Sequence, residues 1–139
     1  RNTNISFEFN KNFDEAIEKN IIQFFDYQSN VSNFIINSNA IILPSYREGL
    51  SHSLLTSASL SRPLIVSNVP GCRELVKNNF NGYLFNPKDY ASLTKAIVDF
   101  LNLTNDQMKQ MGLRSREIVL ENYDENIVID QYKKVIDKI

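Results

Sequence analysis

The sequence predicts an α/β protein, a Rossmann-like parallel sheet with helices on both faces. Short apolar runs alternate with segments whose apolar residues recur at helical spacing, which is the pattern of a parallel α/β sheet. Two runs, 41–43 and 64–66, contain no polar residue, as is typical of strands buried on both faces. The expected strands are residues 5–9, 21–25, 40–43, 64–67 and 83–85.

Helices are expected between these strands and over nearly all of the final third of the chain. The apolar residues Leu54 and Ala58 share one face of the segment 50–60, and a shorter helix is expected over 29–38. N-cap residues fix three further helix starts, of which the first opens a helix over 90–101. These caps are Asp89, Thr104 and Asp124. The apolar stripe of the segment 50–60 also includes Leu50 and Leu55, and that of the helix over 90–101 consists of Leu93, Ile97, Phe100 and Leu101. The stripe of the last helix consists of Ile127, Val128, Tyr132, Val135 and Ile136.

Length and composition exclude several classes of protein. A chain of 139 residues suffices for one domain, and its net charge of −1 argues against an electrostatic nucleic-acid binder. The single cysteine, Cys72, excludes an internal disulfide. No apolar run approaches the roughly 20 residues of a membrane span. The polar start lacks Met and the apolar core of a signal peptide, so we expect a piece of a longer protein.

The chemistry is expected in the loop of residues 44–51, because ligands of open α/β sheets bind at the carboxyl ends of the strands. Gly49 would let a ligand approach the backbone closely. The amides of Gly49, Leu50 and Ser51 would be free at a helix N-terminus, which suits a diphosphate. Glu48, at the rim, would accept hydrogen bonds from sugar hydroxyls, although a plain helix-start acid is an equal alternative.

A second loop, residues 68–74, is expected to line the same crevice after a Pro-Gly turn. Cys72 lies in it and is interpreted as a small loop residue rather than a nucleophile, since no activating group is adjacent in sequence. Tyr27 is a candidate for stacking on a nucleobase, with packing in the core or at the rim as the alternative. Asn and Gly residues at 78–82 predict a tight turn, because both tolerate positive φ.

Several ordered segments resemble the group 1 glycosyltransferases, which are retaining enzymes of the GT-B fold. The resemblance runs from about residue 21 to the end and is carried by residues 44–50, 62–66, 69–76, 81–85, 111–116 and 121–124. It implies that residues 1–139 form the C-terminal, nucleotide-sugar-binding domain, with the acceptor domain absent and little turnover expected from this piece alone. The run 5–9 would be the second strand of that domain, with the family's first strand upstream.

The resemblance also implies roles for single residues. Glu48 would contact the donor sugar, and Gly49 and Leu50 would offer amides to the donor phosphates. The family's Glu-x7-Glu pattern departs at its second position, where Thr56 stands and can bind ribose hydroxyls only as a neutral partner. The remaining donor-site candidates are Ser51, Arg47, His52 and Tyr27. The alternative for Arg47 is a solvated surface charge, and the alternative for His52 is a solvated or helix-capping histidine.

The activity implied is that of a hexosyl- or N-acetylhexosaminyltransferase that uses a nucleoside-diphosphate sugar, with UDP rather than GDP. No cofactor or metal is expected. The expected partners are a glycan or polyprenyl-linked acceptor and the protein's own N-terminal domain, with peripheral membrane contact at the inner face of the cell membrane, in the cytoplasm, and no nucleic acid. A non-catalytic sugar-nucleotide-binding module and a sugar-nucleotide epimerase of the same fold are the alternatives.

Overall fold

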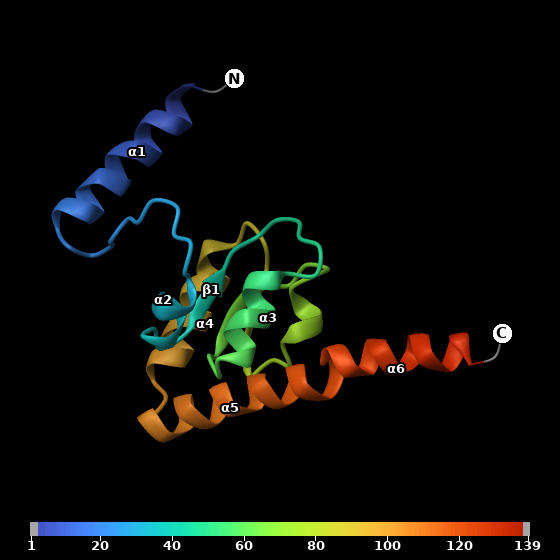
Figure 1. The fold of residues 1–139 in the computed structure, drawn as a ribbon. Coiled ribbons are helices and arrows are strands. Elements are labelled where there is room, and N and C mark those ends of the chain that lie inside the picture. Colours follow the sequence, from blue (N-terminus) through green and yellow to red (C-terminus); the bar gives the residue numbers. More distant parts are fainter. Residues whose placement is uncertain (1–2, 138–139) are drawn as a thin grey trace. The chain divides into compact units, whose positions relative to one another are not determined.

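The computed structural model describes residues 3–137, and the chain divides into two compact units, Arg1–Asn30 and Val31–Ile139 (Figure 1). Each unit has its own internal contacts. No helix among the described residues is long and apolar enough to cross a membrane.

The first unit consists of α1 (Thr3–Glu18) and an irregular segment that follows it. The strand predicted at 5–9 is therefore wrong. Its alternating residues suggested a strand, but the apolar positions 5, 9, 13 and 16 continue at a spacing of three and four, which favours a helix.

The strand predicted at 21–25 is also wrong, because no described strand pairs with it. A tight turn follows α1, with Asn20 at φ 54° and the amide of Ile21 donating to the carbonyl of Ala16 at 2.9 Å. The ring of Phe24 then packs edge-to-face on Phe13, with centroids 6.0 Å apart. Phe24 thus contacts the helix that precedes it instead of pairing in a sheet, although 63% of its surface remains exposed.

The second unit is built on a parallel sheet of three strands, β1 (Ile41–Leu43), β2 (Leu64–Ser67) and β3 (Gly82–Phe85), in the order β1-β2-β3. The predicted strands at 40–43, 64–67 and 83–85 are confirmed to within one residue. Ile65 pairs with Ile42 on one side and with Tyr83 on the other. The tight turn at 78–82 is also confirmed, with Asn79 at φ 62° and a bridge between Asn78 and Gly82.

Helices connect the strands and complete the chain (Figure 1). They are α2 (Ser32–Ile36), α3 (His52–Ser59), the 3-10 turn η1 (Arg73–Leu75), α4 (Tyr90–Leu101), α5 (Asn105–Asn122) and α6 (Glu125–Ile136). The three predicted caps are confirmed, because each side chain accepts a hydrogen bond from an amide of the first helical turn. Asp89 accepts from Ser92, Thr104 from Gln107 within a capping box, and Asp124 from Asn126.

Two predicted helices are shorter than expected. The segment 29–38 is helical only over α2, and the segment 50–60 only over α3. Leu50 precedes α3 and is 51% exposed, so its predicted place in the apolar stripe of that helix is wrong.

The core has two layers, because successive residues of β2 point to opposite faces of the sheet. Leu64 and Val66 join a buried cluster with Leu54 and Ala58 of α3. Ile65 joins the second cluster on the opposite face. That cluster also contains Tyr83, Phe85, Ala96, Phe100 and Met111. Helices thus cover both faces, and the predicted doubly wound fold is confirmed.

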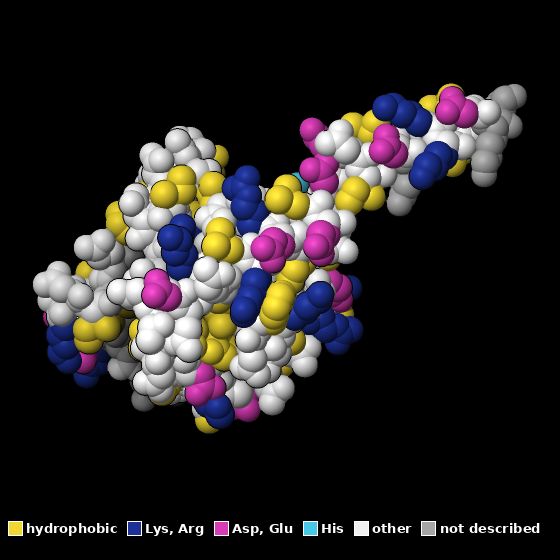
Figure 2. All heavy atoms as spheres, turned by 90° about the horizontal axis from the view of Figure 1, so that it is seen from below, with side chains coloured by type: hydrophobic (Ala, Val, Ile, Leu, Met, Phe, Trp, Pro, Cys, Tyr) yellow, Lys and Arg dark blue, Asp and Glu magenta, His cyan; other side chains and the backbone are white. Residues whose placement is uncertain are grey.

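Burial is incomplete at the edge of the sheet and at the outer helices. Ile42 of β1 is 43% exposed. It lies on the same face of the sheet as Ile65, but α4, which covers this face, packs against β3. The predicted burial of 41–43 on both faces is therefore wrong. Leu101, predicted to face the sheet, is 65% exposed. The apolar residues Tyr132, Val135 and Ile136 of α6 also reach solvent, and Figure 2 shows apolar side chains along this projecting helix.

A glycine lets α5 lie close to the end of α3. A Cβ built on Gly112 would overlap the carbonyl oxygen of Ser61, which is a backbone atom that cannot move aside as a side chain could. Gly112 is buried within α5. The contact between the two helices therefore depends on the absence of a side chain at this position.

Cys72 is part of the core cluster beneath α3 and is fully buried. Burial raises the pKa of its thiol above the ordinary value of 9.0, and the negative charges of Glu48 and Glu74 raise it further. The thiol is thus held in its neutral form, which agrees with the interpretation of Cys72 as a packed loop residue.

We expect Gly112→Ala to lower the free energy of unfolding in urea titrations. Overpacking costs about 1–3 kcal/mol, and we expect a cost at the upper end of this range because the added Cβ meets backbone atoms. This cost exceeds the gain of about 1 kcal/mol that alanine brings over glycine through helix propensity. Gly49→Ala is the matched control, because a Cβ there meets no atom within 4 Å. Equal stability of the two variants would contradict the close approach of α5 and α3.

We expect Cys72 in the folded protein to react with a disulfide reagent at pH 8 at least about tenfold more slowly than in urea, since reaction requires local opening. The raised pKa means that the folded state holds the thiol proton more tightly than the unfolded state. The thiol's contribution to stability is therefore complete below pH 9.0 and is lost as the pH rises through the folded pKa. Equal labelling rates with and without urea would refute the burial of this side chain.

Candidate functional site

Residues 44–51 connect β1 to α3 at the carboxyl end of the sheet. Ser67, at the end of β2, fixes the start of this loop, because its buried hydroxyl lies within hydrogen-bonding distance of the carbonyl oxygens of both Leu43 and Ser45. The loop thus leaves the sheet in a defined direction, set by a side chain of the neighbouring strand.

Glu48 is held by the loop itself. The hydroxyl of Ser45 donates to Oε2 of Glu48 at 3.0 Å, and the Glu48 side chain is half-buried. Its other oxygen, Oε1, accepts no hydrogen bond from the described residues. A carboxylate that is positioned by one oxygen and open at the other can accept a hydrogen bond from a ligand.

The second loop packs directly against the first. Gly71 has φ 86°, and a Cβ there would overlap the carbonyl oxygens of Gly49 and Glu48. Only glycine combines this left-handed backbone with such close contact. The two loops therefore lie in direct contact, and Gly71 is the residue that allows it; that they line one crevice stays a prediction.

Glu74 shapes the second loop rather than facing a ligand. Its carboxylate accepts from the amide of Gly71 at 2.7 Å and pairs with Arg73 at 3.5 Å. Its pKa is lowered, first by the hydrogen bond from its own backbone amide and then by the amide of Gly71 and the charge of Arg73. These local bonds keep the side chain ionised within its own turn.

The three amides expected to be free differ in their bonding. The Ser51 amide donates to the carbonyl of Gly71 at 3.4 Å, so its predicted availability to a phosphate is wrong. The amides of Gly49 and Leu50 donate to no acceptor among the described residues. The second loop thus occupies the amide of Ser51, and the amides of Gly49 and Leu50 remain available to a ligand.

The N-terminus of α3 is left without a side-chain cap. Ser51 occupies the N-cap position, but its buried hydroxyl shares a hydrogen bond with the hydroxyl of Ser53 at 2.9 Å and caps no amide. Uncapped amides and the helix dipole together favour a bound anion. This end of α3 lies directly after Glu48, Gly49 and Leu50 in the chain.

The other predicted site residues are all exposed. Arg47 is exposed in the first loop and forms no ion pair within the described part of the chain. His52 and Thr56 are both exposed and lie one turn apart on α3, as predicted. Tyr27 is 93% exposed and belongs to the first unit, so it is not among the residues that the second unit brings together.

Sequence reasoning missed the two serines that position the loop, Ser45 and Ser67. Ser67 ends an apolar strand and is fully buried, which is unusual for a polar residue unless it is hydrogen-bonded. A serine at the end of a buried strand is thus a usable indication of a loop tether. Among residues 3–137, no three His, Cys, Asp or Glu side chains cluster in a way that could hold a metal ion.

Comparison with known proteins gives the family. Residues 7–118 match the family model of the glycosyl transferases group 1. A galactosyltransferase of Escherichia coli, named UDP-Gal:alpha-D-GlcNAc-diphosphoundecaprenol alpha-1,3-galactosyltransferase, is 30% identical over 95% of this chain and 32% of its own length. A Campylobacter jejuni enzyme, N,N'-diacetylbacillosaminyl-diphospho-undecaprenol alpha-1,3-N-acetylgalactosaminyltransferase, is 25% identical over 90% of this chain and 33% of its own length.

Solved structures share the fold. A Rickettsia africae glycosyltransferase superposes with a TM-score of 0.81 at 20% identity, covering 99% of this chain and 37% of that protein. HepE of Anabaena, solved in complex with UDP, superposes with a TM-score of 0.83 at 15% identity, covering 96% of this chain and 37% of that protein. The chain spans about a third of the length of the curated relatives that it matches. On the family match over most of its length, the chain belongs to the glycosyl transferases group 1.

Proposed function

We propose that the loop of residues 44–51 binds a nucleoside-diphosphate sugar and that residues 1–139 are the donor-binding domain of a retaining glycosyltransferase. The observation that carries this is the uncapped N-terminus of α3 directly beside the fixed carboxylate of Glu48. An anion site next to a hydrogen-bond acceptor matches the two halves of the donor, a diphosphate and a sugar.

The diphosphate is assigned to the start of α3. The free amides of Gly49 and Leu50 and the positive end of the helix dipole stabilise its charge. Gly49 has open space where a Cβ would stand, which leaves room for a phosphate close to the backbone. Arg47, in the same loop and without an ion pair among the described residues, adds a positive charge.

The sugar is assigned to Glu48. Oε2 is held by Ser45, and Oε1 accepts a hydrogen bond from a sugar hydroxyl. This charge-assisted bond is made by the sugar and not by the nucleotide. Loss of the Glu48 carboxylate therefore separates binding of the sugar from binding of the nucleoside diphosphate.

The ribose is assigned to the exposed face of α3 at Thr56, with His52 one turn before it. A hydroxyl here binds a ribose hydroxyl more weakly than a carboxylate would. The Escherichia coli relative, whose name includes UDP-Gal, supports a uridine nucleotide as the donor.

The reaction proposed is transfer of a hexose or N-acetylhexosamine. The bond from the anomeric carbon to the diphosphate oxygen breaks and its electrons pass to the diphosphate. The acceptor hydroxyl forms the new bond to the anomeric carbon and gives its proton to the departing diphosphate. The start of α3 stabilises the departing charge. Both curated relatives carry a diphospho-undecaprenol acceptor in their names, which supports a lipid-linked acceptor, bound by a second domain at the inner face of the cell membrane.

We expect Glu48→Ala to weaken binding of UDP-N-acetylhexosamine at least about tenfold, as expected for a lost hydrogen bond to a charged group, and to leave UDP binding unchanged. Gly49→Ala should weaken both ligands, because its Cβ occupies the space assigned to the phosphates. Thr56→Glu should tighten both about five- to thirtyfold, equivalent to about 1–2 kcal/mol from a charge-assisted ribose bond. Saturation-transfer NMR with UDP, GDP and UDP-N-acetylhexosamine measures these changes.

Glu117→Ala is the matched control, since it removes an exposed carboxylate from α5 that forms no ion pair in the described part of the chain. It should leave the affinity for every nucleotide unchanged. Absence of nucleotide binding by a chain that unfolds cooperatively would refute the donor-site assignment. Equal weakening of UDP and UDP-sugar by Glu48→Ala would refute the sugar role of Glu48.

A further inference from the structure

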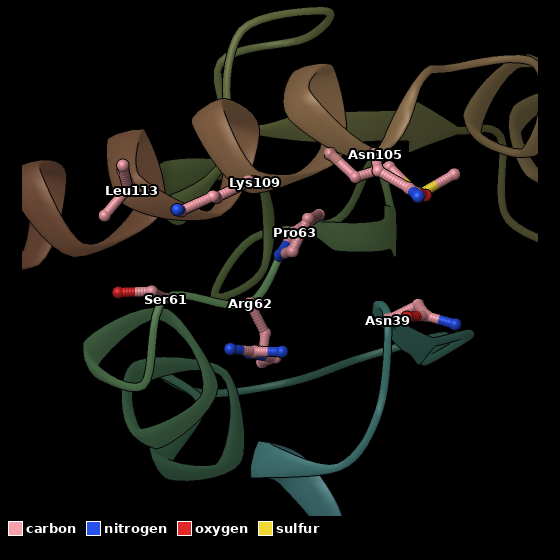
Figure 3. Close-up of a pocket in the computed structure, with 8 residues that line it drawn as sticks. Asn39, Ser61, Arg62, Pro63, Asn105, Lys109 and Leu113 are labelled. Atoms are coloured by element: carbon pink, nitrogen blue, oxygen red, sulfur yellow. The ribbon is translucent and has the colours of Figure 1, made fainter.

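A cleft of about 540 Å³ lies at the end of the sheet opposite to the loop of residues 44–51. Asn39 precedes β1 and Pro63 precedes β2, so the cleft is at the amino ends of the strands. Figure 3 shows α5 as one wall, with Asn105 and Lys109, and the connection from α3 to β2 as the facing wall, with Ser61 and Arg62. The proposed donor site uses none of these residues.

The charged side chains that line the cleft are both cations. Arg62 and Lys109 come from facing walls, and no Asp or Glu lines the cleft. Neither cation forms an ion pair within residues 3–137. Figure 2, which looks onto the α5 side of the molecule, shows Lys and Arg side chains on this surface, with acidic side chains between them. The lining of the cleft itself is thus positively charged and uncompensated.

The guanidinium of Arg62 is held in place before any ligand arrives. Its Nε donates to the carbonyl of Leu60 at 3.1 Å, and one terminal nitrogen donates to the carbonyl of Ser38 at 2.9 Å. Its other terminal nitrogen has no partner among the described residues. A half-buried, fixed cation with a free donor loses little conformational entropy when it binds an anion.

Ser61 has an unusual conformation for its position. It follows the C-cap of α3 with φ 57°, where glycine is the residue ordinarily found. Its hydroxyl forms no hydrogen bond with the described residues. A non-glycine residue in this strained region supports a functional reason for its side chain, and Ser61 lines the cationic cleft.

From these observations we propose that the cleft is a second anion site, which binds a phosphate group through Arg62, Lys109 and Ser61. The amide groups of Asn39 and Asn105 supply further donors. The phosphate belongs either to a soluble phosphate compound or to a lipid headgroup. Both present the same charged oxygens to the cleft.

The test follows backbone amide signals of the full chain by NMR during titration with inorganic phosphate and pyrophosphate. We expect the amides of Ser61, Arg62 and Lys109 to shift in a saturable manner. Amides of residues 49–51 report the proposed donor site separately. The donor site and the anion site in the cleft are therefore tested by different signals.

Lys109→Gln should weaken the saturable shift about two- to fivefold, as expected for an exposed cation. Lys134→Gln, in α6 and away from the cleft, removes the same charge and should change nothing. Ser61→Gly should weaken binding without lowering the thermal midpoint, because glycine is favoured in this backbone conformation. A weaker site in a protein of undiminished stability excludes misfolding as the cause.

Vesicles of phosphatidylglycerol, compared with vesicles of phosphatidylcholine, distinguish the two sources of phosphate. Shifts with soluble phosphate identify a soluble ligand, and Lys109-dependent shifts with anionic vesicles alone identify a lipid headgroup. The proposal is overturned if the cleft amides respond to neither probe. It is equally overturned if Lys134→Gln weakens the response as much as Lys109→Gln.

Discussion

The burial of β2 on both faces is the constraint on which the rest of the second unit depends. Its four residues are all buried, with Leu64 and Val66 against α3 and Ile65 against the layer of α4. The buried strand pairs in parallel with β1 and β3, so the carboxyl ends of β1 and β2 lie together at one edge of the sheet. The hydroxyl of Ser67 can then reach the carbonyl oxygens of Leu43 and Ser45, so the core also orients the loop that carries Glu48.

Two glycines set the surfaces at opposite ends of this core. Gly71 lets the second loop lie on the backbone of Glu48 and Gly49, where it occupies the Ser51 amide and leaves the amides of Gly49 and Leu50 open. Gly112 lets α5 lie on the backbone of Ser61, which closes one side of the cationic cleft. In both places backbone contacts backbone, so the geometry depends on the absence of a single Cβ.

Membership of the glycosyl transferases group 1 and the local geometry of the loop of residues 44–51 rest on different evidence. The family match does not depend on any hydrogen bond, whereas the tether from Ser45 to Glu48 and the uncapped start of α3 are features of this chain's own structure. Thr56 is the point at which the chain departs from the resemblance. Its exposure on α3 makes it accessible to a ligand, and therefore a position where one substitution can measure what the departure costs.

The sequence by itself determined the fold class, three strands, three helix caps and the family, because these depend on local hydrophobic spacing, capping chemistry and ordered motifs. It was wrong at 5–9, where the apolar residues fit a helical spacing as well as a strand, and at 21–25, where an apolar run lies in an irregular segment without a strand partner. It also could not show that the Ser51 amide is occupied, that Ser67 tethers the loop, or that Arg62 and Lys109 line one cleft. Those relations join residues far apart in the chain, and only tertiary packing brings them together.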